Sequence, residues 1–124
     1  MVKRPLRVLV VEDEPLVRML AVEEFEELGF EVHVANDAAS ALEALERIDS
    51  LDLLFTDIQM PGPGNGWDLG RRARELRPAI AVIYATGYGG DQAGPVDHSA
   101  TVRKPYLFSD IEAALRDVGI ASGA

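Results

Sequence analysis

The chain has 124 residues and a formal net charge of -9, which suits one acidic domain with its own hydrophobic core. The negative charge disfavours non-specific binding to nucleic acid or to anionic membranes, since both are themselves negatively charged. The lack of cysteine excludes disulfides, a thiol nucleophile and a thiolate metal site. The longest apolar run, residues 79–85, is too short to cross a bilayer. We therefore expect a single cytoplasmic domain over residues 1–124, with no direct binding to nucleic acid or membrane.

Five short apolar segments indicate β-strands, and each is followed by a helix or by a connection of helical length. The expected strands cover residues 6–11, 31–35, 51–56, 80–85 and 100–103. The expected helices cover residues 15–28, 38–48, 67–77 and 109–118. Residues 87–95 hold four glycines and one proline, so we expect the fourth crossover to be irregular or only partly helical. This alternation predicts an α/β fold with a doubly wound, five-stranded parallel sheet.

Two helix starts carry capping signals. Asn36 or Asp37 is placed to cap the second helix, because a short polar side chain there can accept a hydrogen bond from a free backbone N–H group. Ser109 and Glu112 have the spacing of a capping box, which predicts that the last helix begins at Ser109.

Several charged or titratable residues are expected to be solvated rather than functional. Four of them are arginines of the third helix, which we expect on a solvated face near its negative end: Arg71, Arg72, Arg74 and Arg77. His33 alternates with apolar neighbours in an edge-like strand, and His98 lies in a loop without an acid at metal-binding spacing.

Polar side chains stand at the carboxyl end of nearly every predicted strand. Glu12 and Asp13 follow the first strand, Asp57 the third, Thr86 the fourth and Lys104 the fifth. Ligands of doubly wound sheets bind at this edge, where the winding direction reverses. If the first and third strands are neighbours, each pair of carboxylates about 4 Å apart repels by roughly 4 kcal/mol at an effective dielectric near 20. Such repulsion points to a function rather than to stability.

A hard divalent cation would relieve this repulsion. Mg²⁺ takes oxygen ligands and typically binds through one or two carboxylates together with a phosphate oxygen. Asp57 stands alone at its strand end and is the natural nucleophile for an aspartyl phosphate. Lys104 would then neutralise charge on the transferring group, and Thr86 would donate a hydrogen bond to one of its oxygens.

Four strings in this order, VLVVEDE, LLFTDIQMPG, YATGY and KPY, resemble the receiver domains of two-component response regulators. The resemblance covers the whole chain. It implies the flavodoxin-like strand order 2-1-3-4-5 and a stand-alone receiver with no output domain. It also implies a phosphorelay signalling protein that takes a phosphoryl group from a sensor histidine kinase or a phosphotransfer protein.

The resemblance carries over to individual residues. It makes Asp57 the phosphoacceptor and Thr86 the hydroxyl residue of the site. It makes Lys104 the lysine before a cis peptide bond to Pro105. The Mg²⁺ ligands that it implies are the side chains of Glu12, Asp13 and Asp57 and the backbone carbonyl of Gln59. The output would be altered binding to a downstream protein, and the receiver would promote its own phosphorylation and dephosphorylation without being an enzyme for an external substrate.

One position departs from the family pattern. Receivers commonly carry Tyr or Phe three residues before the lysine as a rotameric switch, and this chain has Thr101 there. The missing aromatic, the YATGY string and the glycine-rich fourth crossover resemble the single-domain FATGUY receivers. Those are associated with histidine kinases of the HWE and related types. Tyr84 and Tyr88 are candidates for the signalling role, and Tyr84 is equally suited to packing.

Three alternatives stay open at this point. A nucleotide or flavin binder would need a glycine or hydroxyl loop after the first strand, where this chain has acids that repel phosphate. An aspartyl phosphohydrolase would need an acid two residues after its nucleophile, where this chain has Gln59. A pseudo-receiver that binds partners without phosphorylation is supported only by the missing aromatic residue.

Overall fold

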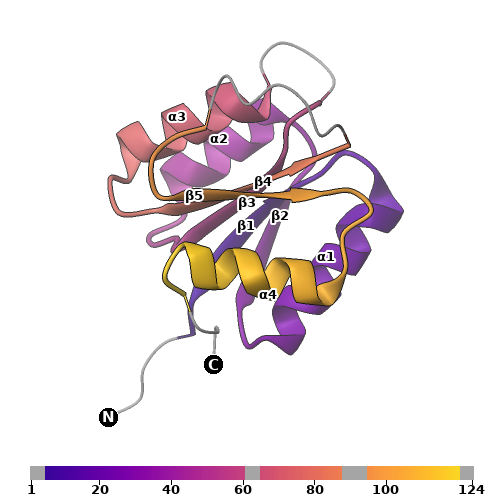
Figure 1. Cartoon of the computed structure of the whole chain (residues 1–124). Coiled ribbons are helices and arrows are strands. Elements are labelled where there is room, and N and C mark those ends of the chain that lie inside the picture. The colour runs from indigo at the N-terminus through magenta and orange to yellow at the C-terminus, as the bar shows by residue number, and fades with distance from the viewer. Residues whose placement is uncertain (1–4, 61–64, 88–94, 121–124) are drawn as a thin grey trace.

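The computed structural model describes residues 5–60, 65–87 and 95–120, which form a five-stranded sheet between two layers of helices (Figure 1). The strands are β1 (Arg7–Val11), β2 (Glu31–Ala35), β3 (Leu53–Asp57), β4 (Ala81–Thr86) and β5 (Ser99–Arg103). The helices are α1 (Pro15–Glu27), α2 (Ala38–Arg47), α3 (Gly66–Leu76) and α4 (Phe108–Asp117).

The strand order is β2-β1-β3-β4-β5, and every neighbouring pair is parallel. The doubly wound sheet and its predicted order are therefore confirmed. The question whether the fourth crossover forms a helix concerns residues 88–94, and these lie outside the described residues.

Helices cover both faces of the sheet in Figure 1, and a cluster of buried hydrophobic residues lies on each face. Along β1, Val8 and Val10 face the layer that contains α1 and α4, while Leu9 and Val11 face the layer of α2 and α3. Strands β3 and β4 are buried along their whole length. Burial on both faces explains why these strands appear in the sequence as continuous apolar runs.

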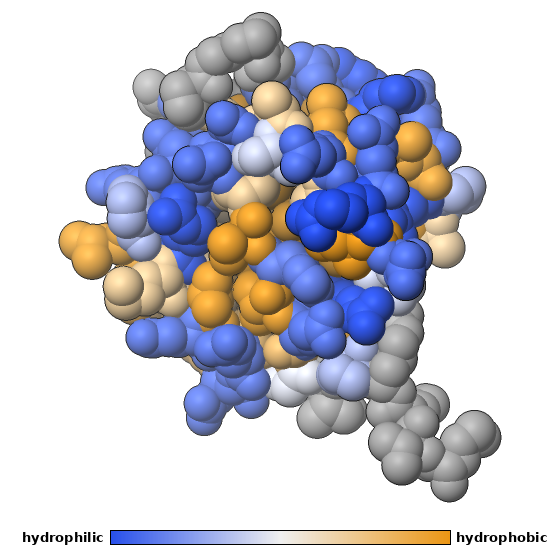
Figure 2. Space-filling view, turned by 180° about the vertical axis from the view of Figure 1, so that it is seen from behind, coloured by the Kyte–Doolittle hydropathy of each residue, from blue (hydrophilic) through white to orange (hydrophobic). Residues whose placement is uncertain are grey.

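The edge strand β2 is less covered than the central strands. It lies on the side of the molecule away from the viewer in Figure 1, and Figure 2 shows hydrophobic groups between hydrophilic ones on that side. Val32 packs against the core, whereas 53% of Val34 is exposed. In the described parts of the chain, no helix is long and apolar enough to cross a membrane.

The ends of the first two helices follow from local chemistry. Pro15 occupies the first turn of α1, where its missing N–H group costs nothing. Gly29 follows the same helix with φ 94°, a conformation that favours glycine. The N-cap of α2 is Asp37, whose carboxylate accepts a hydrogen bond of 2.8 Å from the backbone N–H of Ser40. Of the two predicted capping residues, Asp37 is therefore the one that acts.

The prediction for the start of α4 is wrong. The helix begins at Phe108 rather than Ser109, which lies inside the first turn. The carboxylate of Asp110 reaches back and accepts a hydrogen bond of 2.8 Å from the backbone N–H of Leu107. An acid in the first turn also interacts favourably with the positive end of the helix, so Asp110 decides the boundary.

The arginines of α3 divide into two pairs, and only one pair is solvated as predicted. Arg71 and Arg72 are exposed and pair with acids of the same helix. Arg77, just beyond the helix, donates to the carbonyl oxygens of Leu45 (2.7 Å) and Asp49 (3.3 Å) and to that of Ile48. It thereby satisfies carbonyl groups that the end of α2 leaves without partners.

Arg74 and His98 hold the entry into β5. The guanidinium of Arg74 donates to the carbonyl oxygens of Asp97 (2.6 Å) and His98 (3.0 Å). The ring of His98 donates from Nε2 to the carbonyl oxygen of Val118 at the end of α4, over 2.8 Å. His98 is exposed, as predicted, but its ring also has a backbone partner, because the tertiary fold brings a helix end next to it. His33 has a partner of its own strand, the carboxylate of Glu31, at 2.7 Å.

Candidate functional site

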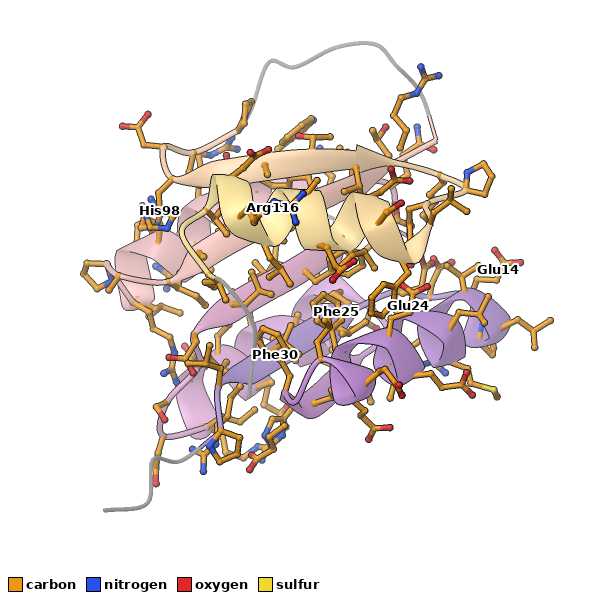
Figure 3. The ribbon with its side chains drawn as sticks, turned by 60° about the horizontal axis from the view of Figure 1, so that its bottom comes forward. Glu14, Glu24, Phe25, Phe30, His98 and Arg116 are labelled. Carbon is orange, nitrogen blue, oxygen red and sulfur yellow. The ribbon has the colours of Figure 1, made fainter. Side chains whose placement is uncertain are left out.

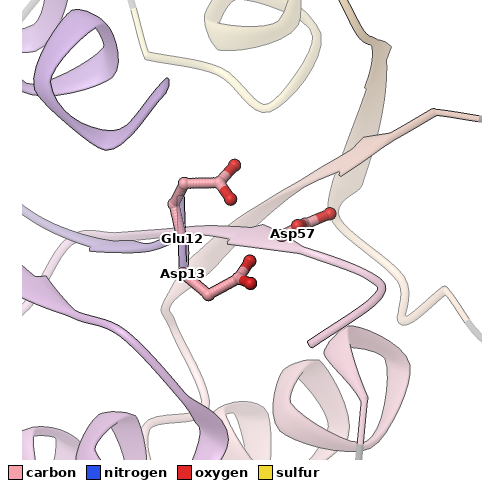
Figure 4. Close-up of side chains that lie close together, drawn as sticks. All are labelled: Glu12, Asp13 and Asp57. Atoms are coloured by element: carbon pink, nitrogen blue, oxygen red, sulfur yellow. The ribbon is translucent and has the colours of Figure 1, made fainter. Parts of the chain in front are cut away.

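Three carboxylates meet at the carboxyl ends of β1 and β3. Because β1 and β3 are adjacent and parallel, Glu12 and Asp13 follow one strand where Asp57 ends its neighbour. Figure 4 shows the three side chains turned toward a common space. One ligand oxygen from each lies within 4.8 Å of those from the other two. The predicted convergence of Glu12, Asp13 and Asp57 is thus present in the fold.

Lys104 joins this cluster from the end of β5. Its Nζ atom donates to Oε1 of Glu12 at 2.7 Å and to Oδ2 of Asp57 at 3.0 Å. Glu12 and Asp57 are 3% and 7% exposed, so both ion pairs are shielded from bulk water. Two charge-assisted hydrogen bonds therefore fix the ammonium group between the two acids.

Burial and their mutual contact change the pKa values of Glu12 and Lys104. Desolvation raises the pKa of Glu12, and the nearby charge of Asp57 adds to it, against the hydrogen bond from Lys104. Desolvation disfavours the ammonium form of Lys104, but the hydrogen bonds to Glu12 and Asp57 outweigh it and raise the pKa of Lys104. For both groups, the hydrogen bond between them is the largest of the interactions that favour the charged form.

The backbone around Glu12 is held by three hydrogen bonds. Its N–H donates to the carbonyl oxygen of Ala35 on β2 at 3.1 Å. Its Oε2 atom accepts from the backbone N–H of Glu14 at 3.2 Å, and its carbonyl oxygen accepts from Arg18 at 2.8 Å. The sequence contained no signal for Arg18, because its role depends on how α1 folds back over the strand end.

The backbone beyond Asp57 is packed closely against the start of α3. The N–H of Gly66 donates to the carbonyl oxygen of Ile58 at 2.8 Å. A Cβ atom on Gly66 would lie 2.3 Å from the carbonyl oxygen of Asp57. Only glycine fits this contact without movement, so Gly66 helps to position the end of β3.

Thr86 and Gln59 lie at the same edge of the sheet. Asp57 is in register with Ala85, and Thr86 follows as the last residue of β4. The carbonyl oxygen of Thr86 accepts a hydrogen bond of 2.7 Å from the N–H of Lys104. Gln59 is exposed two residues beyond Asp57, on the loop that leaves β3.

Thr101 stands beside Tyr84 in the sheet. The two residues are register partners on β5 and β4, and Thr101 is exposed whereas Tyr84 is fully buried. Tyr84 packs on Trp67 with ring centroids 4.5 Å apart, and its hydroxyl accepts from the N–H of Val96 at 3.3 Å. Burial raises the pKa of Tyr84. Tyr84 therefore has the packing role, and Tyr88 lies outside the described residues.

Tyr106 is a further residue near the site that sequence reasoning missed. The Lys104–Pro105 peptide bond is cis, as the family resemblance implied. Tyr106 packs edge-on against Phe55 of β3, with ring centroids 5.5 Å apart. Burial raises the pKa of Tyr106, and the nearby charge of Glu12 adds to it.

The acids fit a divalent cation. Carboxylate oxygens are the hard donors that Mg²⁺ prefers, and three of them converge from Glu12, Asp13 and Asp57. Asp13 is exposed, so the cluster is open to solvent on one side. A site with few protein carboxylates and an open side suits Mg²⁺, which keeps several of its water ligands.

Acids stand at the strand ends where a nucleotide binder of this fold would have its phosphate-binding loop, so the acidic edge disfavours a nucleotide binder. The family model described as response regulator receiver domain matches residues 8–116. The chain therefore belongs to the response regulator receiver domain family of two-component systems. It is 31% identical over 121 residues to the response regulator receiver protein CpdR of Brucella abortus, covering 94% of this chain and 98% of CpdR.

Two further relatives show where such domains occur. The sensor kinase CckA of Brucella abortus is 38% identical over 85 residues, which are 68% of this chain but only 9% of the kinase. The response regulator TrrA of Thermotoga maritima, solved in complex with Mg²⁺–BeF, superposes with a TM-score of 0.80 at 28% identity. That match covers 91% of this chain and 98% of TrrA. The FATGUY subfamily is not confirmed by these matches.

Proposed function

We propose that this receiver accepts a phosphoryl group on Asp57 from a phosphohistidine of a sensor histidine kinase or a phosphotransfer protein. A carboxylate oxygen of Asp57 forms a bond to phosphorus, and the bond between phosphorus and the histidine nitrogen breaks. The histidine nitrogen keeps the electron pair of that bond, and the ring leaves as neutral imidazole when its other nitrogen carries a proton. The observation that carries the proposal is the cluster of Asp57, Glu12, Asp13 and Lys104 at one strand edge.

Lys104 and Thr86 would each interact with the phosphoryl group as it is transferred to Asp57. Lys104 already contacts Asp57, so its ammonium is placed to neutralise charge on the incoming phosphoryl oxygens. Thr86 is the hydroxyl residue at the end of the neighbouring strand and would donate a hydrogen bond to one of those oxygens. Its carbonyl is tied to Lys104, so the two groups are held together.

Glu12, Asp13 and Asp57 would hold the cation, with the backbone carbonyl of Gln59 as the further protein ligand that the family implies. When bound, Mg²⁺ would supply positive charge at the phosphoryl oxygens. The Mg²⁺-bound relative TrrA supports this assignment. A bound cation would also explain why three acids converge here, because without one they repel each other.

The output of such a receiver is a change in protein binding or a further phosphorelay step. We propose a stand-alone receiver, in agreement with its match to nearly the whole of CpdR. It would act in the cytoplasm, and it would promote its own phosphorylation and dephosphorylation without turning over an external substrate. HWE and related kinases are the first phosphodonors to test, because of the glycine-rich crossover and Thr101.

Labelling by acetyl phosphate tests the proposal. Wild type should form an acid-labile adduct when Mg²⁺ is present and none after chelation, and Asp57→Asn should form none. The double variant Glu26→Gln/Glu27→Gln, altered at exposed acids away from the cluster, is the control and should be labelled like wild type. Equal labelling of Asp57→Asn and wild type would show that another residue is the acceptor. A phosphotransfer profile against histidine kinases would then identify the donor.

A further inference from the structure

A pocket lies next to the phosphoacceptor cluster, between α1 and the segment that follows β5. Its volume is about 280 Å³. It is lined by Val17, Leu20, Glu24, Lys104, Pro105 and Tyr106. The volume falls slightly below the range of roughly 300 to 1,000 Å³ that small-molecule sites occupy. The pocket therefore suits a single side chain better than a cofactor.

Two polar atoms of this pocket lack partners. Oε2 of Glu24 and the hydroxyl oxygen of Tyr106 are shielded from solvent and have no hydrogen-bond partner among the described residues. Figure 3 shows Glu24 on the side of α1 that faces α4. Buried polar groups in proteins are nearly always hydrogen-bonded, so two neighbouring exceptions indicate groups that meet an external partner.

The surroundings of Glu24 favour a cation as that partner. Three exposed glutamates stand in the same last turns of α1, namely Glu23, Glu26 and Glu27, and no basic residue is in the last turn. Negative charge is unfavourable at this end of a helix, because the helix dipole is negative there. Burial raises the pKa of Glu24, which means that its charged form lacks compensation in the isolated chain.

Exposed apolar side chains occur on both segments that form the pocket. Leu20, which lines it, is 58% exposed, Leu16 of the same helix is 71% exposed, and Leu107, the residue after Tyr106, is 67% exposed. Large exposed apolar side chains near a pocket indicate a contact with another protein. Together with the glutamates, they describe a partner surface that is apolar in one part and basic in another.

We propose that this pocket is a subsite for one arginine side chain of the phosphodonor protein, with Glu24 and Tyr106 as its recognition residues. The inference rests on the proposed phosphotransfer to Asp57 and adds the chemistry that selects the donor. A guanidinium has several donors in one plane, so it can bond the Glu24 carboxylate and the Tyr106 hydroxyl oxygen together. Its aliphatic stem would contact Val17, Leu20 and Pro105. The broad torsion of the glutamate carboxyl group lets either oxygen turn toward the pocket.

Binding of a side-chain analogue tests the subsite without any phosphorylation. Butylguanidinium should shift the NMR signals of the Glu24 carboxyl carbon and the Tyr106 ring in a saturable manner, whereas neutral butylurea should not. Glu24→Gln should lose this response, and the matched control Glu23→Gln, which removes the same charge from an exposed neighbour, should keep it. A response that survives in Glu24→Gln, or one of equal size with butylurea, would overturn the proposal.

Phosphotransfer from the cognate kinase provides the second readout. Glu24→Gln should lower the kcat/KM of transfer about tenfold through KM, as expected for the loss of a charge-assisted hydrogen bond. Labelling by acetyl phosphate, measured in the same variants, reports damage around Asp57, so the ratio of the two rates isolates docking. An unchanged ratio in Glu24→Gln would refute the subsite. A wild type that acetyl phosphate fails to label would instead refute the proposed function.

Discussion

Gly66 shows how a single residue sets the position of the phosphoacceptor. The nearest atom to an added Cβ is the carbonyl oxygen of Asp57 itself, at 2.3 Å, and that atom belongs to the backbone and cannot swing aside. We predict that Gly66→Ala lowers the free energy of unfolding by about 3 kcal/mol, since overpacking forces backbone shifts. It should also slow labelling of Asp57 by acetyl phosphate.

Gly87→Ala is the matched control, because a Cβ there meets no atom within 4 Å among the described residues. Its free energy of unfolding in urea should stay within about 0.5 kcal/mol of wild type. If Gly66→Ala is as stable as Gly87→Ala, α3 is free to move away from β3 and the close contact does not constrain Asp57.

At the scale of elements, the C-terminal end of α2 depends on a residue that follows another helix. Arg77 donates hydrogen bonds to the carbonyl oxygens of Leu45, Ile48 and Asp49. We predict that Arg77→Ala lowers the free energy of unfolding by about 2 kcal/mol, because charged hydrogen bonds are lost and part-buried carbonyls are left unpaired. Arg72→Ala removes an exposed arginine that pairs only within α3, and it should cost less than about 0.5 kcal/mol. Similar urea midpoints for the two variants would show that the hydrogen bonds from Arg77 do not stabilise the end of α2.

The other end of α2 should respond to pH. Hydrogen bonds from the backbone N–H and hydroxyl of Ser40 lower the pKa of Asp37 below its ordinary value of 3.8. A lowered pKa in the folded state means that the carboxylate stabilises the fold above that ordinary value and loses this effect as the pH falls through the folded pKa. The Tm of Asp37→Ala should therefore lie below that of wild type at neutral pH, and the difference should narrow in acid below about pH 4. A difference in Tm that does not change with pH would show that the charge of the cap is unimportant.

For the whole molecule, the acidic cluster links metal binding to stability. Three carboxylates meet one ammonium in the folded chain, so they still repel each other without a metal ion, whereas the unfolded chain separates them. If Mg²⁺ binds only the folded state, a concentration of 100 times Kd stabilises it by about 2.7 kcal/mol. For a chain of this length, we expect Tm to rise by about 10 °C.

The double variant Glu12→Gln/Asp13→Asn should lose this Mg²⁺-dependent rise in a thermal melt. The variant Glu26→Gln/Glu27→Gln removes the same charge from exposed positions on α1 and should retain it. A rise of equal size in both variants would place the ion elsewhere.

The sequence by itself determined the strands, their fold class and the residues at their carboxyl ends. Burial on both faces makes a strand apolar throughout, so the carboxylate of Asp57 marks the point where β3 leaves the core. Local hydrogen bonds limited the precision of the predicted helix ends. At the start of α4, the carboxylate of Asp110, one residue after Ser109, accepts the hydrogen bond from the free backbone N–H group.

Only the tertiary structure decided which distant groups meet. The ammonium of Lys104 contacts Glu12, which lies 92 positions earlier, because β5 and β1 end at the same edge of the sheet. Arg77 and His98 read as solvated in the sequence, yet each donates to the end of a helix that packing brings beside it. Glu24 is one of several glutamates on α1 in the sequence, and it becomes part of a pocket only when the segment around Tyr106 folds against that helix. Hydrophobic periodicity is local and predicts elements, whereas these contacts arise from chain segments that no local pattern relates.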